Sequence, residues 1–310
     1  MEEQKNNAAK HAFFYFLSLI ALVFVAIATG TIIFQIINKE IVDIINEYSG
    51  LYSDVAIRFG ISALIIATPI FYVTARQIYK NLASGALDKD SGVRKWLTYL
   101  ILLVAIVVMI SWLISTLNSF LGGEITTKFI LKSVTALFIS GFIFSFYLYD
   151  IRRDKAVGKK DKVITSYFYV SLALILVVLV AAFMFVDSPV KTRNKKIDQS
   201  IVDDFSRLSG AINSYYNYYD HLPENLEQVT MEYDYIDEDY LNNPQTDQAY
   251  QYNVLGSKEY ELCTDFITSN KDKGALDDFY NQQWLHEAGY QCLKQKITKE
   301  PAGMEDVRPL

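Results

Sequence analysis

The chain has 310 residues, 51% of them hydrophobic, and a formal net charge of −6 at pH 7. Residues 1–186 contain 17 Lys and Arg against 12 Asp and Glu, whereas residues 187–310 contain 12 against 23. So acidic a second half is repelled by nucleic acid and by anionic lipid head groups, and we therefore expect no nucleic-acid partner. The contrast predicts two domains that divide near residue 187.

Five apolar runs in the first half are long enough to cross a bilayer, because a spanning helix needs about 20 apolar residues. They predict an all-α membrane bundle over residues 12–186 that follows a short N-terminal segment, residues 1–11. The first run is too long for a signal peptide and should remain as an anchor. The expected spans cover approximately residues 12–38, 56–75, 96–121, 129–149 and 167–186.

The connecting segments differ in charge. Residues 76–95 and 152–162 concentrate Lys and Arg, which cytoplasmic loops retain. We therefore expect a cytoplasmic N-terminus and an extracytoplasmic domain over residues 187–310. The basic residues between 191 and 196 oppose this orientation, but charges of a large translocated domain carry less weight. Residues 41–52 are either a short interfacial helix or a continuation of the first helix.

Ionisable side chains are scarce within the predicted spans, although such groups usually mark ion or proton pathways. Arg58 and Lys132 lie near span ends, where snorkelling to the head groups explains them. The polar stripe of the third span, Ser111, Ser115 and Asn118, indicates helix packing rather than a pathway. A transport function is therefore disfavoured.

Residues 12–154 contain a series of sequence signals in a fixed order. They are Pro69 in ATPIFY, the segment 94–99 before the third span, Gly122 and Gly123 after it, and the final YLYDIRRD. In this order they resemble a bacterial multi-pass membrane domain of unknown function, the family numbered 5671, found in cell-envelope proteins. The resemblance implies a multi-pass helical bundle and assigns no activity.

The acidic half begins with a helical pattern. Apolar residues recur every three or four positions over residues 197–219, which predicts an amphipathic helix that Pro223 ends. QAYQYNV (248–254) and EYELCTDF (259–266) alternate with the strand period, and residues 255–258 form the expected hairpin turn. We interpret the aromatic residues as packing between helix and hairpin rather than as a recognition surface. The packing set is Tyr215, Tyr216, Tyr219, Pro223, Tyr250, Tyr252 and Tyr260.

The order AINSYYNYYDHLPENLEQV, YLNNPQTDQAYQYNV and YELC resembles the globular domain of type II secretion pseudopilins and type IV pilins. The resemblance implies a small extracytoplasmic α+β domain, a long helix packed on a short antiparallel sheet, that assembles with other proteins. The fifth span lacks the processing site and the glutamate of pilins, which argues against a filament subunit. Some pseudopilins bind calcium near this point, but the spacing of the local acidic residues matches no calcium loop, and we expect a solvated acidic loop. These residues are Asp237, Glu238, Asp239 and Asp247.

Both cysteines, Cys263 and Cys292, lie in the acidic half, which suits an oxidising compartment and predicts a disulfide between them. The alternative is two unrelated buried thiols. His286 lies near Cys292, but two candidate ligands do not make a tetrahedral zinc site. The sequence contains no nucleotide-binding or hydrolase motif, so we expect no catalytic residue, metal or cofactor.

Together these features predict a non-enzymatic, multi-pass protein of the cytoplasmic (inner) membrane that displays a pilin-like domain for protein–protein interaction or assembly. The expected partners are the lipid bilayer and an unidentified envelope protein or a second copy of the chain. The alternative function is a transporter or channel component with a regulatory outer domain. The scarcity of charge at mid-membrane favours the first.

Overall fold

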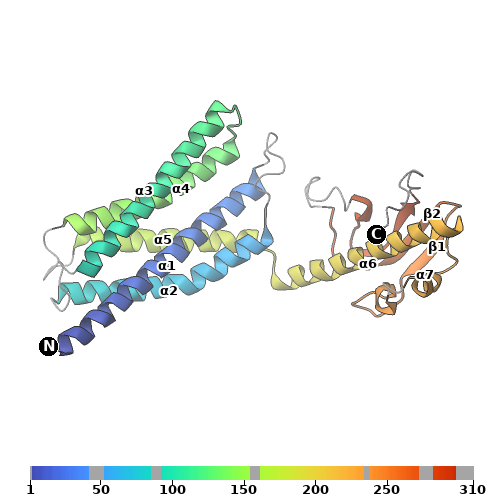
Figure 1. Cartoon of the computed structure of the whole chain (residues 1–310), viewed down its shortest axis with the longest axis horizontal. Helices are drawn as coiled ribbons and strands as arrows, with labels where there is room; N and C mark the ends of the chain where they lie inside the picture. The colour runs from blue at the N-terminus through green and yellow to red at the C-terminus, as the bar shows by residue number, and fades with distance from the viewer. Residues whose placement is uncertain are drawn as a thin grey trace, which may run out of the picture. The chain divides into compact units, whose positions relative to one another are not determined.

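The computed structural model divides the chain into two compact units, Met1–Val186 and Asp187–Leu310, which we call the membrane unit and the C-terminal unit (Figure 1). Residues 41–52, for which the sequence predicted either an interfacial helix or a continuation of the first helix, lie almost wholly outside the described residues. The structure describes residues 2–41, 52–84, 92–153, 161–233, 237–271 and 282–297.

The membrane unit is built from five apolar helices, each long and apolar enough to cross a membrane. The prediction of five apolar helices in this half of the chain is therefore confirmed. Side-chain caps explain where three of them begin, because Ser53, Thr126 and Asp161 each accept a hydrogen bond from a backbone N–H in the first helical turn. The helices are α1 (Glu2–Glu40), α2 (Asp54–Ala83), α3 (Gly92–Leu121), α4 (Thr127–Arg152) and α5 (Lys162–Phe185).

Two close helix pairs, α1–α2 and α3–α4, organise the membrane unit. Gly60 lets α2 approach α1, because a Cβ at this position would lie only 2.7 Å from Ile32 Cγ1. Small residues commonly permit such contacts between membrane helices. Between α3 and α4, Thr116 Oγ1 donates to Ser133 Oγ at 3.1 Å. In Figure 1 the α3–α4 pair diverges from α2 and α5 toward its α3–α4 turn.

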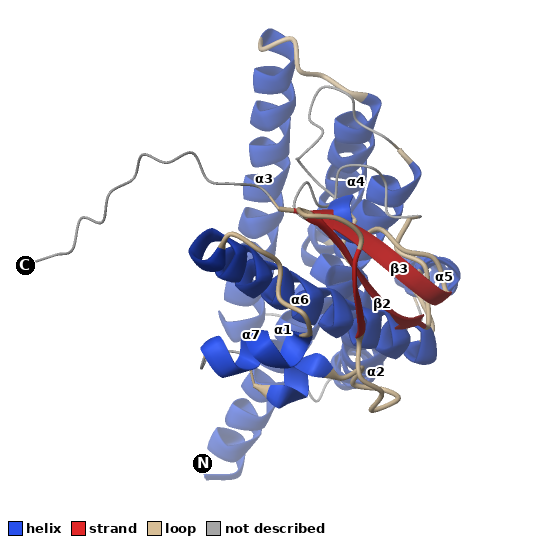
Figure 2. Cartoon of the chain, turned by 90° about the vertical axis from the view of Figure 1, so that its right-hand side faces the viewer, coloured by secondary structure: helices blue, strands red, loops and turns tan. Residues whose placement is uncertain are grey.

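The C-terminal unit contains a long helix and a three-stranded antiparallel sheet of order β1-β2-β3. Figure 2 shows the strands β2 and β3 beside α6. The hairpin of β1 and β2 was predicted, whereas β3 was not; a specifically pilin-like fold is not shown. The helices are α6 (Pro189–Tyr219), α7 (Leu226–Glu232), η1 (Glu238–Leu241) and η2 (Gln282–Trp284), and the strands are β1 (Gln251–Val254), β2 (Glu259–Phe266) and β3 (Gly289–Lys296).

The apolar stripe of α6 forms the core of this unit with the sheet. Phe205 is fully buried, and its ring contacts Tyr250 and Trp284 at centroid distances of 4.9 and 5.7 Å. Asp198 ties the end of β2 to the helix, because its carboxylate accepts from the N–H groups of Ile267 at 2.9 Å and Thr268 at 2.7 Å. Burial of the stripe therefore fixes the sheet on one side of α6.

A disulfide joins Cys263 of β2 to Cys292 of β3, as the sequence predicted. The two residues are directly opposite in the antiparallel register. The bond closes a loop with a sequence separation of 29 residues. In the chain-entropy model a loop of this size stabilises the folded state by roughly 3 to 4 kcal/mol.

We expect Cys292→Ser to lower the free energy of unfolding of the C-terminal unit by roughly 3 to 4 kcal/mol, because the unfolded chain regains the freedom that the bridge removes. Hydrogen exchange should accelerate in β3 and remain unchanged in α1–α5. The control is the wild-type chain under reducing conditions, which should behave like the variant. Two freely reactive thiols in the non-reduced wild-type protein would contradict the prediction.

Candidate functional site

Four charged residues, two of them buried and two half-buried, form a group at one end of the membrane unit. We call Arg94, Asp150, Arg153 and Asp161 the charge cluster. The Arg94 guanidinium donates to the Asp150 carboxylate at 2.7 Å and to the Asp150 carbonyl oxygen at 3.2 Å. Arg153 Nε lies 3.0 Å from the second Asp150 carboxylate oxygen, and Arg153 Nη1 lies 3.7 Å from Asp161 Oδ2. The two positive and two negative charges balance one another.

Each member of the charge cluster is placed by a helix end. Arg94 is in the first turn of α3 and Asp150 is in the last turn of α4, so the antiparallel pair brings them to the same level. Asp161 caps α5, because its carboxylate accepts from the Val163 N–H at 2.8 Å. Tyr149 also donates to Asp161, at 3.0 Å. The cluster therefore joins α3, α4 and the start of α5 at one end, which we call the basic end of the membrane unit.

Burial makes the pairing within the charge cluster strong. The side chains of Arg94 and Asp150 are each only 5% exposed. For Asp161, burial opposes the charged form, but hydrogen bonds from the Val163 N–H and the Tyr149 hydroxyl, with the nearby Arg153 charge, outweigh it and lower its pKa. Asp161 is therefore ionised at neutral pH. Removing one partner from a buried pair leaves an uncompensated charge, which is strongly destabilising.

In the sequence, Arg94 belongs to a basic loop and Asp150 to a signal of the family resemblance. Neither residue was predicted to be buried or paired. The available signal was the presence of opposite charges at the facing ends of two consecutive spans, since consecutive antiparallel helices bring such ends together. Arg58 and Lys132, the charged residues near the predicted span ends, lie outside the charge cluster.

A cavity of about 710 Å³ lies within the membrane unit next to the charge cluster, and all five helices contribute to its lining. Its volume is within the range of about 300–1,000 Å³ that is usual for small-molecule sites. The walls are mainly apolar and aromatic. Representative lining residues are Phe71, Phe138, Phe142, Phe168, Leu174 and Val178.

Polar groups line this cavity at two levels. Along the middle of the lining, the Tyr72 hydroxyl and Ser171 Oγ form a hydrogen bond of 2.7 Å with each other. Near the charge cluster, the Tyr15 hydroxyl is buried and has no hydrogen-bond partner within the part of the chain that the structure describes. Arg76 and Lys80 line the cavity at the same end, and neither forms an ion pair with a described residue. The basic end of the cavity thus offers polar donors and a surplus of positive charge.

A group of aromatic rings lies at the C-terminal end of α6 in the other unit, and we call Tyr215, Tyr218, Tyr219 and His221 the aromatic patch. Tyr219 is central, with ring centroids 4.5 Å from Tyr215, 4.7 Å from Tyr218 and 6.0 Å from His221. Tyr218 is 77% exposed and Tyr219 is 39% exposed. A hydrogen bond to Glu232, with a smaller effect of burial, raises the pKa of Tyr219.

The residues of the predicted packing set have different environments. Tyr216, Tyr250, Tyr260 and Pro223 are buried, whereas Tyr215 and Tyr252 are half-buried. Tyr250 donates to Asp204 at 2.8 Å, and Tyr260 contacts Ser209 Oγ at 2.9 Å. The expectation that Tyr219 packs beneath the sheet needs correction, because Tyr219 is exposed. It lies in the last turn of α6 and packs on Tyr215 and His221 instead.

The candidate metal ligands are not brought together among the described residues. Among the described residues, Glu261, Cys263 and Cys292 place their side-chain ligand atoms close enough together for a metal ion. The two sulfur atoms form the disulfide, however, and offer no thiolate. The His286 ring stacks on Phe266 at 3.8 Å, which is a packing contact. In the acidic segment, Asp247 has a positive φ of 57°, typical of a turn, and the side chain of Glu238 lies outside the described residues.

Comparison with known proteins concerns the membrane unit. Residues 11–147 match the model of a family described as a domain of unknown function, DUF5671. This match confirms the resemblance expected for the N-terminal half. It extends from within α1 into α4 and ends three residues before Asp150. No curated protein and no solved structure matches the chain.

We expect Arg94→Gln to lower the free energy of unfolding of the membrane unit by about 3 to 5 kcal/mol, since it leaves Asp150 buried with one cationic partner fewer. The matched control is Arg152→Gln, which removes an exposed arginine from the same end of the membrane unit and should change stability by about 0.5 kcal/mol or less. Thermal unfolding of the detergent-solubilised full chain provides the measurement. Equal losses in the two variants would contradict a structural role for the buried pair.

Proposed function

We propose that the chain is a non-enzymatic, multi-pass protein of the cytoplasmic membrane that displays its C-terminal unit outside the cytoplasm. There the aromatic patch binds a basic segment of another envelope protein. The observation that carries this proposal is the exposed aromatic patch on a unit with a strong excess of acidic residues. The sequence of the C-terminal unit also resembles pseudopilins, which are assembly proteins, and this resemblance supports the same role.

The charge distribution supports this orientation. The basic end of the membrane unit includes Arg76, Lys80 and the ends of α3–α5, and positively charged segments are retained in the cytoplasm. The basic residues that follow α5 are partly offset, because Asp187 pairs with Lys191 at 3.0 Å and also with Lys195. The Cys263–Cys292 disulfide is consistent with an oxidising location of the C-terminal unit.

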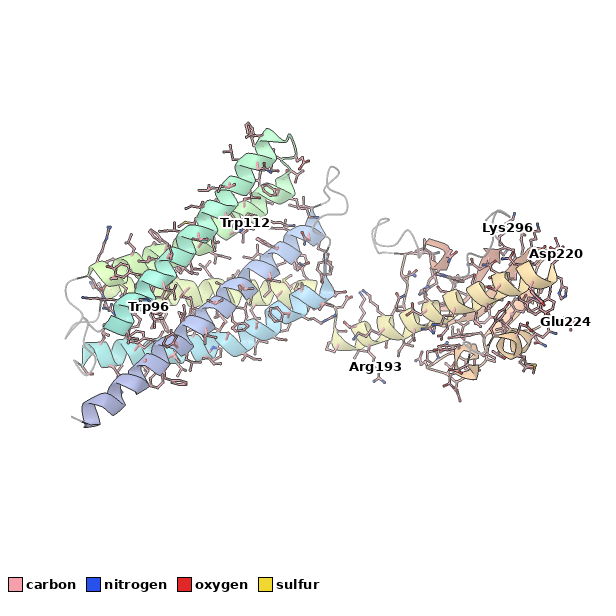
Figure 3. All side chains as sticks on the ribbon, viewed as in Figure 1. Trp96, Trp112, Arg193, Asp220, Glu224 and Lys296 are labelled. Atoms are coloured by element: carbon pink, nitrogen blue, oxygen red, sulfur yellow. A yellow bond between two sulfur atoms is a disulfide. The ribbon has the colours of Figure 1, made fainter. Side chains whose placement is uncertain are left out.

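The chemistry of the aromatic patch favours a cationic partner. Tyrosine rings attract Lys and Arg side chains through cation–π contacts, and tyrosine is enriched among residues that dominate binding energy. Asp220 and Glu224 lie at the same end of the unit, as Figure 3 shows, and Glu232 interacts with Tyr219. A second copy would present the same acidic surface, so charge repulsion favours a different protein as the partner.

The alternative function, a transporter or channel component, has less support from the placement of charge. Ion pathways usually carry ionisable groups at mid-membrane depth. The charge cluster instead lies at helix ends, where it joins α3, α4 and α5. Its geometry favours a structural connection over a relay across the bilayer.

The orientation can be tested with reporters fused after Lys160 and after Leu310. We expect the first fusion to behave as cytoplasmic and the second as exported, because five spans carry the chain across the membrane an odd number of times. A fusion after Glu40 should also be exported and serves as an internal control. The reverse pattern would overturn the extracytoplasmic location of the C-terminal unit.

The partner prediction can be tested by photo-crosslinking in membranes with p-benzoylphenylalanine at position 218. The control position is Tyr290 of β3, a tyrosine that is 49% exposed and outside the aromatic patch. We expect position 218 to crosslink to a Lys- or Arg-rich segment of one other protein. In binding assays with that protein, Tyr219→Ala should weaken affinity about tenfold or more.

Three results would contradict the partner prediction. The first is equal crosslinking at positions 218 and 290, and the second is a crosslink to a second copy of the chain. The third is a crosslink that persists unchanged in the double variant Glu224→Gln/Glu232→Gln, since removing two carboxylates should weaken attraction of a basic segment.

A further inference from the structure

The cavity of the membrane unit has the form expected of a site for an elongated apolar ligand. Its lining follows α5 from Asp161 to Val178, a rise of about 25 Å at 1.5 Å per residue. This length exceeds one leaflet, which is about half of a hydrocarbon core about 30 Å thick. An extended acyl chain of one leaflet therefore fits along the cavity.

The way α4 and α5 meet explains why this space exists. The ring contacts and hydrogen bonds between the two helices involve Phe142, Ser145, Phe146 and Tyr149 of α4, which meet residues 161–167 at the start of α5. Farther along, Leu174 and Val178 line the cavity instead. The helices are thus joined at the basic end and separate beyond it, which leaves an apolar space between them.

The basic end of the cavity differs chemically from the rest. The charge cluster is internally neutral, so Arg76 and Lys80 add two positive charges to the lining that the cluster's carboxylates do not neutralise. The buried Tyr15 hydroxyl lacks a partner among the described residues and can donate to a ligand oxygen. An occupant that satisfies both ends has an apolar chain and an anionic, oxygen-rich head.

We propose that this cavity binds one anionic phospholipid, with an acyl chain between α4 and α5 and the phosphate near Arg76, Lys80 and Tyr15. The surrounding bilayer supplies such molecules at high local concentration. A phosphate carries the negative charge that Lys and Arg attract at a membrane surface. The proposal concerns the membrane unit alone and does not depend on the partner of the aromatic patch.

The test uses the full chain purified in detergent and native mass spectrometry during titration with phosphatidylglycerol or phosphatidylcholine. We expect one phosphatidylglycerol to bind per chain, with a clear preference over phosphatidylcholine. The double variant Arg76→Gln/Lys80→Gln should reduce phosphatidylglycerol affinity about fivefold for each charge removed. The control Lys95→Gln/Arg152→Gln removes two charges from the same end, at exposed positions that do not line the cavity, and should leave affinity unchanged.

A second pair of variants tests the acyl-chain part of the site. Ala26 lines the cavity, so Ala26→Phe should fill part of it and abolish binding of both lipids. Ile27→Phe, at the neighbouring position, is the control, because Ile27 is 55% exposed and does not line the cavity. Thermal unfolding without added lipid checks that each variant is folded.

A measurement on the wild-type chain keeps the proposal open to refutation even if a variant fails to fold. Phosphatidylglycerol with a photoactivatable acyl chain should crosslink to lining residues of α4 or α5 such as Ile139, Ile143, Phe168 and Val178. Crosslinks only to outward-facing residues would overturn the proposal, as would equal binding of the two lipids. Inorganic phosphate that competes fully with the lipid would indicate an anion site without an acyl chain and would also overturn it.

Discussion

The membrane unit depends on the ion pairs that the buried Asp150 carboxylate forms. One of its oxygens accepts a hydrogen bond from Arg94, and the other faces Arg153. Arg153 also approaches Asp161 at the start of α5, so one buried carboxylate connects α3, α4 and α5. In an apolar environment such charges are tolerated only when they are paired, which fixes the relative register of these helix ends. The far end of α5 is tied to α1 instead, because the Phe185 carbonyl accepts from Lys39 at 3.0 Å. The cavity between α4 and α5 follows from this difference between the two ends.

The C-terminal unit is held by a different kind of contact. Its stability rests on the apolar stripe of α6, with Phe205 and Ile212 fully buried, and on the disulfide that fastens β3 to β2. Small domains bury a limited apolar area, so one covalent link has a large effect on them. Trp284 adds a large buried side chain from outside the sheet and covers Phe205.

The features that the sequence predicted are those with a local pattern. Five spans, the hairpin of β1 and β2, and the disulfide each follow from run length, alternation or the location of two cysteines. The strand β3 was missed because GYQCLKQK has few apolar residues and is defined mainly by its pairing with β2. The Arg94–Asp150 pair was missed for a related reason, since the two residues are 56 positions apart and meet only when α3 and α4 pack.

The exposure of the aromatic patch has a geometric origin in the same unit. The stripe of α6 remains buried as far as Tyr216, whereas Tyr218 and Tyr219 are in the final turn and are exposed. Asp220 then adopts a left-handed conformation and ends the helix, which holds the chain at His221 against Tyr215 and Tyr219. Exposed rings that pack on one another have less conformational freedom than isolated side chains. The aromatic patch therefore loses little conformational entropy when a partner binds it. The helix terminus that stops the core thus also preorganises the surface to which we assign binding.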